Sequence, residues 1–332
     1  AAPRCFSYAE AAAASDSSFL DNQETSLHIA SDSLDYDSSD LKQDVAFRHS
    51  YWQHRRERVY RVLQTIGHDP MRVHRFAHCG AGAWVQRAIG EPNKFRVISA
   101  KCHDRFCEAC QREKRLKIAR NLMSKLPDGR VRFVTLTLRS SATPLDQQID
   151  RMLKAFAKMR RGRKLSKCFI GGIWFLEVTK NSKTNLWHPH VHCLVQGDYI
   201  PLDLLRLEWH RCTGDSYIVD VRDIKHVKEV CGYVTKYASK AVNLAALQSD
   251  ADLSEAMTVF RGQRMFAAFG TWVRLKLSAA CESEIEWEYF ERLATIRRKA
   301  KEGDDVSIQI LHQLRAAGPI TTEPYEYIPP PF

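Results

Sequence analysis

The stretch His188-Pro189-His190-Val191-His192 alternates histidine with other residues and continues into the apolar run Cys193-Leu194-Val195. This alternation predicts a β-strand over residues 189–196, in which His188, His190 and His192 share one face of a sheet. Imidazole rings in a row on one face suit a divalent ion such as Mn²⁺ or Zn²⁺. The sequence therefore predicts a metal-facing strand.

A glutamate on the preceding strand completes this arrangement. Residues 171–180 read as a strand, and the short connection over residues 181–187 predicts an antiparallel hairpin with the histidine strand. Glu177 can then reach the face that carries His190 and His192. Its hard oxygen favours Mg²⁺ or Mn²⁺, so these three side chains are the predicted ligands of a catalytic metal.

Strands and helices alternate around this hairpin. Further strands are expected over residues 131–138, 217–221 and 266–275, and helices over residues 47–66, 111–125, 145–161, 202–211, 224–242 and 283–301, with another helix from Ser254 onward. This order predicts an α+β fold in which an antiparallel sheet is flanked by helices.

A tyrosine motif falls on the expected helix 224–242. The stretch Tyr233-Val234-Thr235-Lys236-Tyr237-Ala238-Ser239-Lys240 contains two overlapping Tyr-x-x-Lys units. Residues four apart share a helix face, so Tyr233 and Tyr237 project together and are predicted nucleophiles. Lys236 and Lys240 would favour the phenolate form and hold a phosphate group. The alternative is that the tyrosines only anchor the helix to the sheet.

Four cysteines have the spacing of a zinc site. Cys102-x4-Cys107-x2-Cys110, with Cys79 upstream, can close a tetrahedral shell, which would be structural. His78 and His103 are competing ligands, and ordinary buried thiols are the alternative. The zinc would brace a set of cations that we expect to face DNA: Arg105, Arg112, Lys114, Arg115, Lys117 and Arg120.

Composition and charge restrict the class of protein. The chain has 332 residues, 44% of them hydrophobic and 27% charged, with a formal net charge of +11. Residues 1–45 contain nine acidic and two basic residues, so the rest of the chain carries +18 and favours a polyanionic partner. No apolar run is long enough to cross a membrane, and we see no signal peptide. Ten cysteines, four of them with metal spacing, indicate a reducing cytoplasm.

Three motifs in the same order resemble a known family. Phe133-Val134-Thr135-Leu136-Thr137-Leu138, His190-Val191-His192 and the Tyr-x-x-Lys helix resemble those of rolling-circle replication initiators, the Rep proteins of the HUH endonuclease superfamily. The cysteine module and residues 261–270 resemble further parts of plasmid Rep proteins. The family's metal-ligand roles carry over to His190 and His192 and, by position, to Glu177; His188 is an extra histidine that the family does not require.

Composition, pattern and the resemblance together predict four regions. These are a disordered acidic tail over residues 1–45, basic helices and a zinc module over 46–127, an HUH nicking and joining domain over 128–280, and a C-terminal helix with a Pro-rich tail over 281–332.

The resemblance also implies a function. A tyrosine would nick single-stranded or hairpin origin DNA with the help of the metal, remain joined to the 5′ phosphate, leave a 3′ hydroxyl as a primer, and later rejoin the strands. The sequence has no Gly-x4-Gly-Lys-Ser/Thr loop, so a host helicase is an expected partner. The alternatives are a transposase or relaxase of the same superfamily, and a zinc-dependent DNA-binding regulator without catalysis.

The tyrosine helix allows two readings of the nucleophile. Glu229 lies four residues before Tyr233, which resembles single-tyrosine initiators in which the carboxylate activates water. Tyr233 lies four residues before Tyr237, which resembles two-tyrosine initiators in which the phenols alternate. We favour two nucleophiles, because Tyr237 has its own lysine, Lys240.

Overall fold

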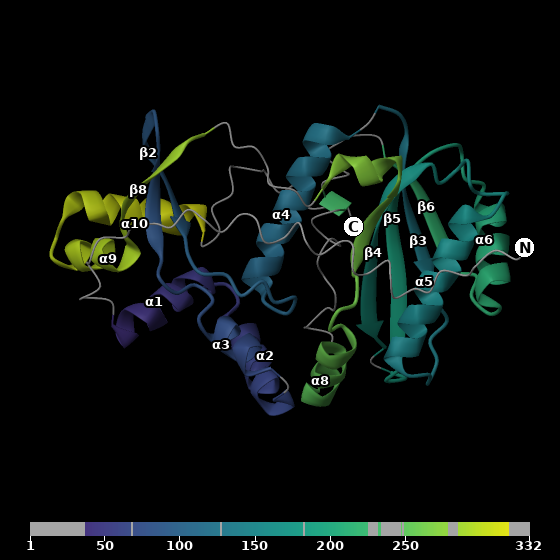
Figure 1. Ribbon diagram of the computed structural model, residues 1–332, viewed down its shortest axis with the longest axis horizontal. Coiled ribbons are helices and arrows are strands. Elements are labelled where there is room, and N and C mark those ends of the chain that lie inside the picture. Colours follow the sequence, from purple (N-terminus) through teal and green to yellow (C-terminus); the bar gives the residue numbers. More distant parts are fainter. Residues whose placement is uncertain are drawn as a thin grey trace, which may run out of the picture. The chain divides into compact units, whose positions relative to one another are not determined.

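A computed structural model describes residues 37–67, 69–126, 128–181, 183–224, 232–233, 247, 249–277 and 285–318 (Figure 1). All described helices and strands belong to the compact unit Ser38–Phe332. Most of the predicted acidic tail and all of the Pro-rich tail lie outside the described residues.

The larger sheet has five antiparallel strands in the order β6-β3-β5-β4-β7 (Figure 1). The strands are β3 (Val131–Thr137), β4 (Gly171–Lys180), β5 (Trp187–Gln196), β6 (Val219–Ile224) and β7 (Phe266–Gly270). The predicted α+β class with an antiparallel sheet is confirmed, as is the hairpin of β4 and β5.

Two asparagines, Asn181 and Asn185, stabilise the turn of this hairpin. The Asn181 side-chain oxygen accepts hydrogen bonds from the backbone N–H of Lys183 and Thr184, at 2.9 and 3.2 Å. Asn185 adopts a φ of 55°, a left-handed conformation that asparagine tolerates better than most residues. These local contacts fix the register in which β4 meets β5.

One face of the sheet is covered by α5 (Leu145–Arg161) and α6 (Leu202–Thr213), as Figure 1 shows. Helix α5 contributes apolar residues at helical spacing, including Ile149, Met152 and Phe156, and these are buried. The indole N–H of Trp209 in α6 donates to the backbone oxygen of Thr137 at 2.9 Å. This face of the sheet is therefore apolar and buried.

The opposite face packs partly against α4 (Glu108–Lys125) and a 3-10 helix, η2 (Thr271–Leu275). Its buried cluster contains these side chains: Ile118 and Leu122 of α4, Phe133 of β3, Ile173 and Phe175 of β4, Leu194 of β5 and Trp272 of η2. Alternation along each strand places the predicted histidines on this same face.

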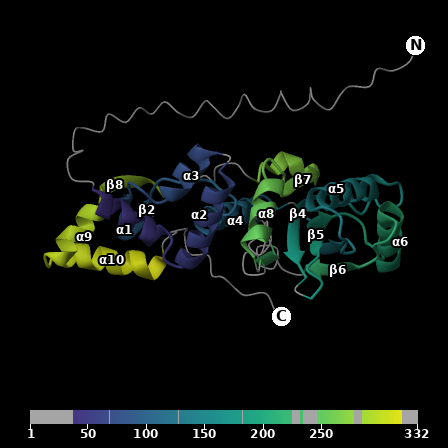
Figure 2. The same ribbon diagram turned by 90° about the horizontal axis from the view of Figure 1, so that it is seen from below.

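A second sheet was not predicted from the sequence. It has three antiparallel strands in the order β2-β1-β8, with β1 at Trp84–Ala88, β2 at Glu91–Ile98 and β8 at Trp287–Arg292. Helices α9 (Leu293–Lys301) and α10 (Asp305–Ala317) pack beside it (Figure 2).

The predicted helix over residues 283–301 is therefore wrong in its first part. Residues 287–292 form a strand because their aromatic rings pack across the sheet. Tyr289 meets Trp84 edge to face at 5.6 Å between ring centroids, and Phe290 meets Phe95 at 5.6 Å. The helix begins only at Leu293.

The N-terminal helices also differ from the prediction. The helix expected over residues 47–66 begins later, because α2 covers Gln53–Ile66 and residues 47–48 are the end of a separate helix, α1 (Ser38–Arg48). Helix α1 begins inside the range 1–45 that was expected to be a disordered tail. It is ordered by the buried Asp44, which accepts from the backbone N–H of Ala83 at 2.9 Å and pairs with Arg297.

Two further helices complete the described elements. Helix α3 (Pro70–Ala77) starts at an Asp69 cap, whose side chain accepts from the backbone N–H of Arg72 at 3.0 Å. Helix α8 (Asp250–Val259) is capped by Ser249 in the same way, at 3.1 Å from the N–H of Asp252. None of the helices described is both long and apolar enough to cross a membrane.

We predict that Asp44→Asn lowers the free energy of unfolding by about 3 kcal/mol, because Arg297 would lose its carboxylate partner in a buried position. Urea denaturation followed by circular dichroism measures the change. Asp128→Asn, in an exposed turn, is the control and should change stability by no more than about 0.5 kcal/mol. Equal stability of the Asp44 variant and the wild type would contradict the ordering of α1 by this contact.

Candidate functional site: a histidine face and a cysteine cluster

His190 and His192 project from β5 onto the face that opposes α5. The Nδ1 atom of His190 lies 3.2 Å from the hydroxyl of Thr137, and the Nδ1 atom of His192 lies 3.1 Å from the hydroxyl of Thr135. Both threonines belong to the neighbouring strand β3 and are direct cross-strand partners of these histidines. With Nδ1 held in this way, the ring orientation is fixed and Nε2 is the atom that each ring presents to a ligand.

Glu177 lies on the other side of the same histidine pair. It is the cross-strand partner of His190, and its Oε2 accepts a hydrogen bond from the Nε2 atom of His192 at 2.9 Å. His192 is buried and Glu177 is half-buried. The structure thus brings a carboxylate oxygen and the predicted ligand nitrogen together.

Burial favours the neutral form of two histidines, His188 and His190. Burial, together with His188 and His192, lowers the pKa of His190 to about 4, and burial also lowers the pKa of His188. His188 lies beside His190, with 4.3 Å between their ring centroids. A neutral imidazole is the form that binds a metal ion. His190, His192 and Glu177 do not, however, form a set whose ligand atoms all lie within 4.8 Å of one another.

Tyr233 lies on the same face, separated from His192 by the ring of Phe133. Its ring stacks on Phe133 with centroids 4.1 Å apart and an interplanar angle of 17°, and Phe133 is stacked on His192 at 5.6 Å and 11°. The other residues of the motif, Lys236, Tyr237 and Lys240, and the alternative partner Glu229 lie outside the described residues.

Arg222 is a site residue that the sequence analysis missed. It is the cross-strand partner of Phe133, the ring on which Tyr233 stacks. Asp220, which it contacts at 2.7 Å, raises the pKa of Arg222, and Tyr233 contributes further in the same direction. No sequence motif marks it; only the pairing of β6 with β3 brings this cation to the tyrosine.

The four predicted cysteines form one cluster. Sγ of Cys79 lies 3.8 Å from that of Cys107 and 3.6 Å from that of Cys110, and Cys102 lies 3.8 Å from Cys110. All four sulfur atoms lie within 4.8 Å of one another. Tetrahedral zinc with bonds of about 2.3 Å places its sulfur ligands roughly 3.8 Å apart. The cluster therefore has the size needed to hold a metal such as zinc.

The cluster is assembled from three parts of the chain. Cys79 follows α3, Cys102 lies in the loop after β2, and Cys107 and Cys110 lie at the start of α4. The competing ligands His78 and His103 are not in the cluster; the Nδ1 atom of His78 bonds instead to the backbone oxygen of His74 at 2.9 Å.

A buried cation supports thiolates in this cluster. Arg48 donates to Sγ of Cys110 at 3.6 Å and to Oε1 of Glu113 at 2.9 Å, and its side chain is 5% exposed. Hydrogen bonds among the four thiols lower the pKa of Cys79 and of Cys110 and raise that of Cys102 and of Cys107. Metal-binding cysteines must be deprotonated, so the positive charge of Arg48 beside Cys110 favours the ligand form.

The six predicted DNA-facing cations differ in how far their side chains are exposed to solvent. Arg112 and Lys114 are exposed, whereas the other four are half-buried. Arg115 lies 4.0 Å from Glu108, and Arg105 donates to the backbone oxygen of Gln263 at 2.9 Å. Lys114 lies over the ring of Phe266 at 4.9 Å. Contact of these residues with DNA stays a prediction.

Comparison with known proteins identifies the family. The family described as Replication protein (Rep_1) matches residues 95–313, about two thirds of the chain, from β2 to α10. The chain therefore belongs to this family of plasmid replication proteins.

Curated relatives agree with this assignment. A protein named Protein rep from Lactiplantibacillus plantarum is 28% identical over 188 residues, which cover 50% of this chain and 57% of the relative. Protein rep from Streptococcus pneumoniae is 24% identical over 208 residues, covering 55% and 64%, and Protein rep from Bacillus amyloliquefaciens is 28% identical over 178 residues, covering 50% of each. The chain thus spans between half and two thirds of the length of these relatives. No solved structure matches it.

We predict that purified protein contains about one equivalent of zinc and that Cys107→Ser loses it, because a tetrahedral site needs all four thiolates. The melting temperature should fall by about 10 °C, since structural zinc contributes directly to folding. Elemental analysis and calorimetry measure both quantities. Cys212→Ser, outside the cluster, should keep its zinc. Freshly purified wild type without zinc would refute the assignment.

Proposed function

We propose that this protein is a rolling-circle replication initiator that nicks and rejoins single-stranded origin DNA. One observation carries the proposal: in a chain of the Replication protein family, the histidine pair, Glu177 and Tyr233 share one face of the sheet. The basic charge of the chain beyond residue 45 suits the DNA substrate. The HUH type of the domain, its boundaries at residues 128–280 and the need for a host helicase belong to the same proposal.

The donor types of three residues suit the metal that this function requires, and binding it would draw together ligand atoms that do not all lie within 4.8 Å of one another in this structure. The residues that would hold it are His190, His192 and Glu177. The imidazole of His190 is neutral, and that of His192 points its Nε2 atom at the carboxylate. The Nδ1 atoms of the two rings are already hydrogen-bonded to Thr137 and Thr135. When bound, Mg²⁺ or Mn²⁺ would polarise the scissile phosphate and stabilise the charge that develops on it. Nitrogen and oxygen donors together are compatible with Mn²⁺ as well as Mg²⁺.

The nucleophile in this proposal is the phenol oxygen of Tyr233. It forms a bond to phosphorus while the bond from phosphorus to the 3′ oxygen breaks, and the 3′ oxygen takes up a proton to become the primer hydroxyl. Arg222, the cross-strand partner of Phe133, is the nearby cation, and Phe133 stacks on both the tyrosine ring and the His192 ring and so holds Tyr233 in position. Rejoining reverses the step, because the phosphotyrosine ester retains the energy of the broken bond.

A second nucleophile remains part of the proposal. Tyr237, with Lys240, would attack when the origin is regenerated, while Lys236 accompanies Tyr233. The support for it is the duplicated Tyr-x-x-Lys spacing in the sequence.

We predict that His190→Ala and His192→Ala each reduce nicking by about a hundredfold or more, because each change removes a ligand of the metal. Binding of single-stranded DNA should stay largely intact, since it depends mainly on phosphate contacts. Covalent adducts formed in Mn²⁺ on a pool of oligonucleotides with randomised centres measure nicking and reveal the cleaved sequence. His210→Ala, at an exposed histidine of α6, is the control. Undiminished cleavage by both variants would exclude this metal site.

We predict that Tyr233→Phe and Tyr237→Phe each still form an adduct on the remaining phenol and that the double variant forms none, because either oxygen can attack phosphorus. Mass spectrometry of the adduct formed on the selected oligonucleotide maps the linked residue. If Tyr237→Phe nicks and rejoins like the wild type while Glu229→Ala blocks termination, a single tyrosine acts and the carboxylate activates water.

A further inference from the structure

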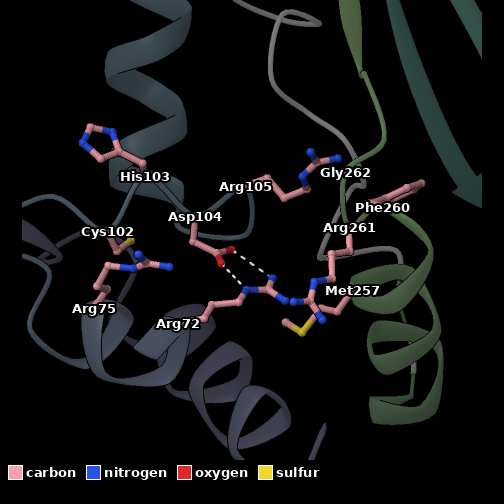
Figure 3. Close-up of a pocket in the computed structure, with 10 residues that line it drawn as sticks. All are labelled: Arg72, Arg75, Cys102, His103, Asp104, Arg105, Met257, Phe260, Arg261 and Gly262. Atoms are coloured by element: carbon pink, nitrogen blue, oxygen red, sulfur yellow. Dashed lines mark hydrogen bonds and ion pairs between the residues drawn. The ribbon is translucent and has the colours of Figure 1, made fainter. Parts of the chain in front are cut away.

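A pocket of about 410 Å³ lies outside the histidine face. Its wall comes from three places: α3 supplies Arg72 and Arg75, the loop between Cys102 and Cys107 supplies Arg105, and the turn after α8 supplies Arg261 (Figure 3). Residues 72 and 261 are far apart in the sequence, so this pocket exists only in the folded chain.

The lining is strongly positive. It contains four arginines and one carboxylate, Asp104, which leaves a formal excess of three positive charges. Asp104 is already engaged, because it accepts from Arg72 at 2.6 and 3.4 Å and from the backbone N–H of Phe106 at 2.8 Å. Arg75 and Arg261 are exposed, and no ion pair within the described ranges uses either of them. Two guanidinium groups are thus available to an anion.

Two buried apolar side chains lie behind the arginines. Phe260 is 0% exposed and Met257 is 1% exposed, so they support the turn that carries Arg261 and leave almost no apolar surface of their own open to a ligand. Phe260 is held in place by stacking on Phe106, with ring centroids 6.4 Å apart. A pocket lined by guanidinium groups on this buried support matches a phosphate group, which needs charge-assisted donors.

The pocket is linked directly to the strand that carries Glu177. Arg105 donates to the backbone oxygen of Gln263 at 2.9 Å, and two residues later the oxygen of Met265 accepts from the backbone N–H of Leu176 at 2.7 Å. Leu176 is the residue before Glu177. Phe266 continues this path, because it stacks on Phe175, the cross-strand partner of His192. The segment 261–266 therefore leads from the pocket to the histidine face.

We propose that this pocket binds one phosphate-bearing nucleotide of the single-stranded DNA that flanks the cleavage site. The inference rests on the proposed nicking function and adds a second anchor for the strand. Arg75 and Arg261 bind the phosphate, Arg72 and Arg105 add to the positive charge, and the buried Phe260 and Met257 hold the turn that carries Arg261 in place. Such an anchor fixes the position of the strand along the protein, which chemistry at a single phosphate requires.

The experiment compares the double variant Arg75→Gln/Arg261→Gln with the wild type and with Arg264→Gln. Arg264 is an exposed arginine close to Arg261 in the chain but does not line the pocket, so it is a matched control. Fluorescence anisotropy with a labelled 20-nucleotide single strand measures Kd over a range of salt concentrations. We expect the double variant to bind about tenfold more weakly, with a salt slope smaller by roughly 0.7 for each phosphate that the protein no longer neutralises. The control should bind like the wild type.

Three further measurements make the outcome decisive. Zinc content and melting temperature equal to those of the wild type show that the variants fold, and the two single variants replace the double one if it does not. Photocrosslinking with 5-iododeoxyuridine at successive positions around the nick should label residues 257–262 from one position only. Calorimetry with deoxythymidine monophosphate tests the free nucleotide as the source of the phosphate.

The proposal is overturned if the double variant keeps the wild-type Kd and salt slope while the wild type nicks DNA. It is also overturned if the double variant loses only its affinity for the free mononucleotide and still binds the oligonucleotide normally. A wild type that binds DNA through these arginines but forms no covalent adduct would leave the phosphate site in place and refute the nicking function instead.

Discussion

The hydrogen-bonded position of β5 between β3 and β4 is the constraint on which the histidine site depends. Residues 190–196 pair with β3 on one side and with β4 on the other. Because side chains alternate with a period of two, a slip of one residue would exchange His190 and His192 for Val191 and Cys193. The apolar core under α5 prevents that slip, since it requires Val191 and Cys193 to be buried. Packing on one face therefore determines the chemistry on the other.

The two faces of the five-stranded sheet differ in composition and in role. The face under α5 and α6 is filled with apolar side chains and contributes stability. The face beside α4 holds a row of polar groups whose partners come from three neighbouring strands: threonines from β3, histidines from β5 and Glu177 from β4. Arg222 of β6 extends this row toward the tyrosine. Side chains held on rigid strands keep their positions better than side chains on loops, which suits a site whose groups must keep a fixed geometry.

The sequence predicted those parts of the molecule that have a short period or a fixed spacing. The alternation of histidines located β5, and the short connection after Lys180 located the hairpin. The spacing Cys102-x4-Cys107-x2-Cys110 located the cluster, because a helix start brings the last two thiols together.

Features that depend on distant pairing could not be predicted in this way. The sheet of β1, β2 and β8 joins residues about two hundred positions apart, and the charged sequence of β8 reads as a helix until its aromatic partners are known. The polar sequence of α1 does not predict a folded helix. The helix is ordered because Asp44 contacts Ala83 and Arg297, which are distant in the sequence. The roles of Thr135, Thr137 and Arg222 likewise follow from register, which a single sequence does not contain.

Helix α4 joins the two sites mechanically. Its first turn carries Cys110 and is preceded by Cys107, while Ile118 and Leu122 pack in the cluster that also includes Phe133 and Tyr233. A helix of 18 residues is a rigid rod of about 27 Å. If zinc fixes the N-terminal end of α4, zinc binding is thermodynamically linked to the order of Phe133, the ring on which Tyr233 stacks. Part of the free energy of metal binding at the cysteines then stabilises the packing of Ile118 and Leu122 against Phe133. Zinc would therefore help to order a ring that is not part of the cysteine cluster.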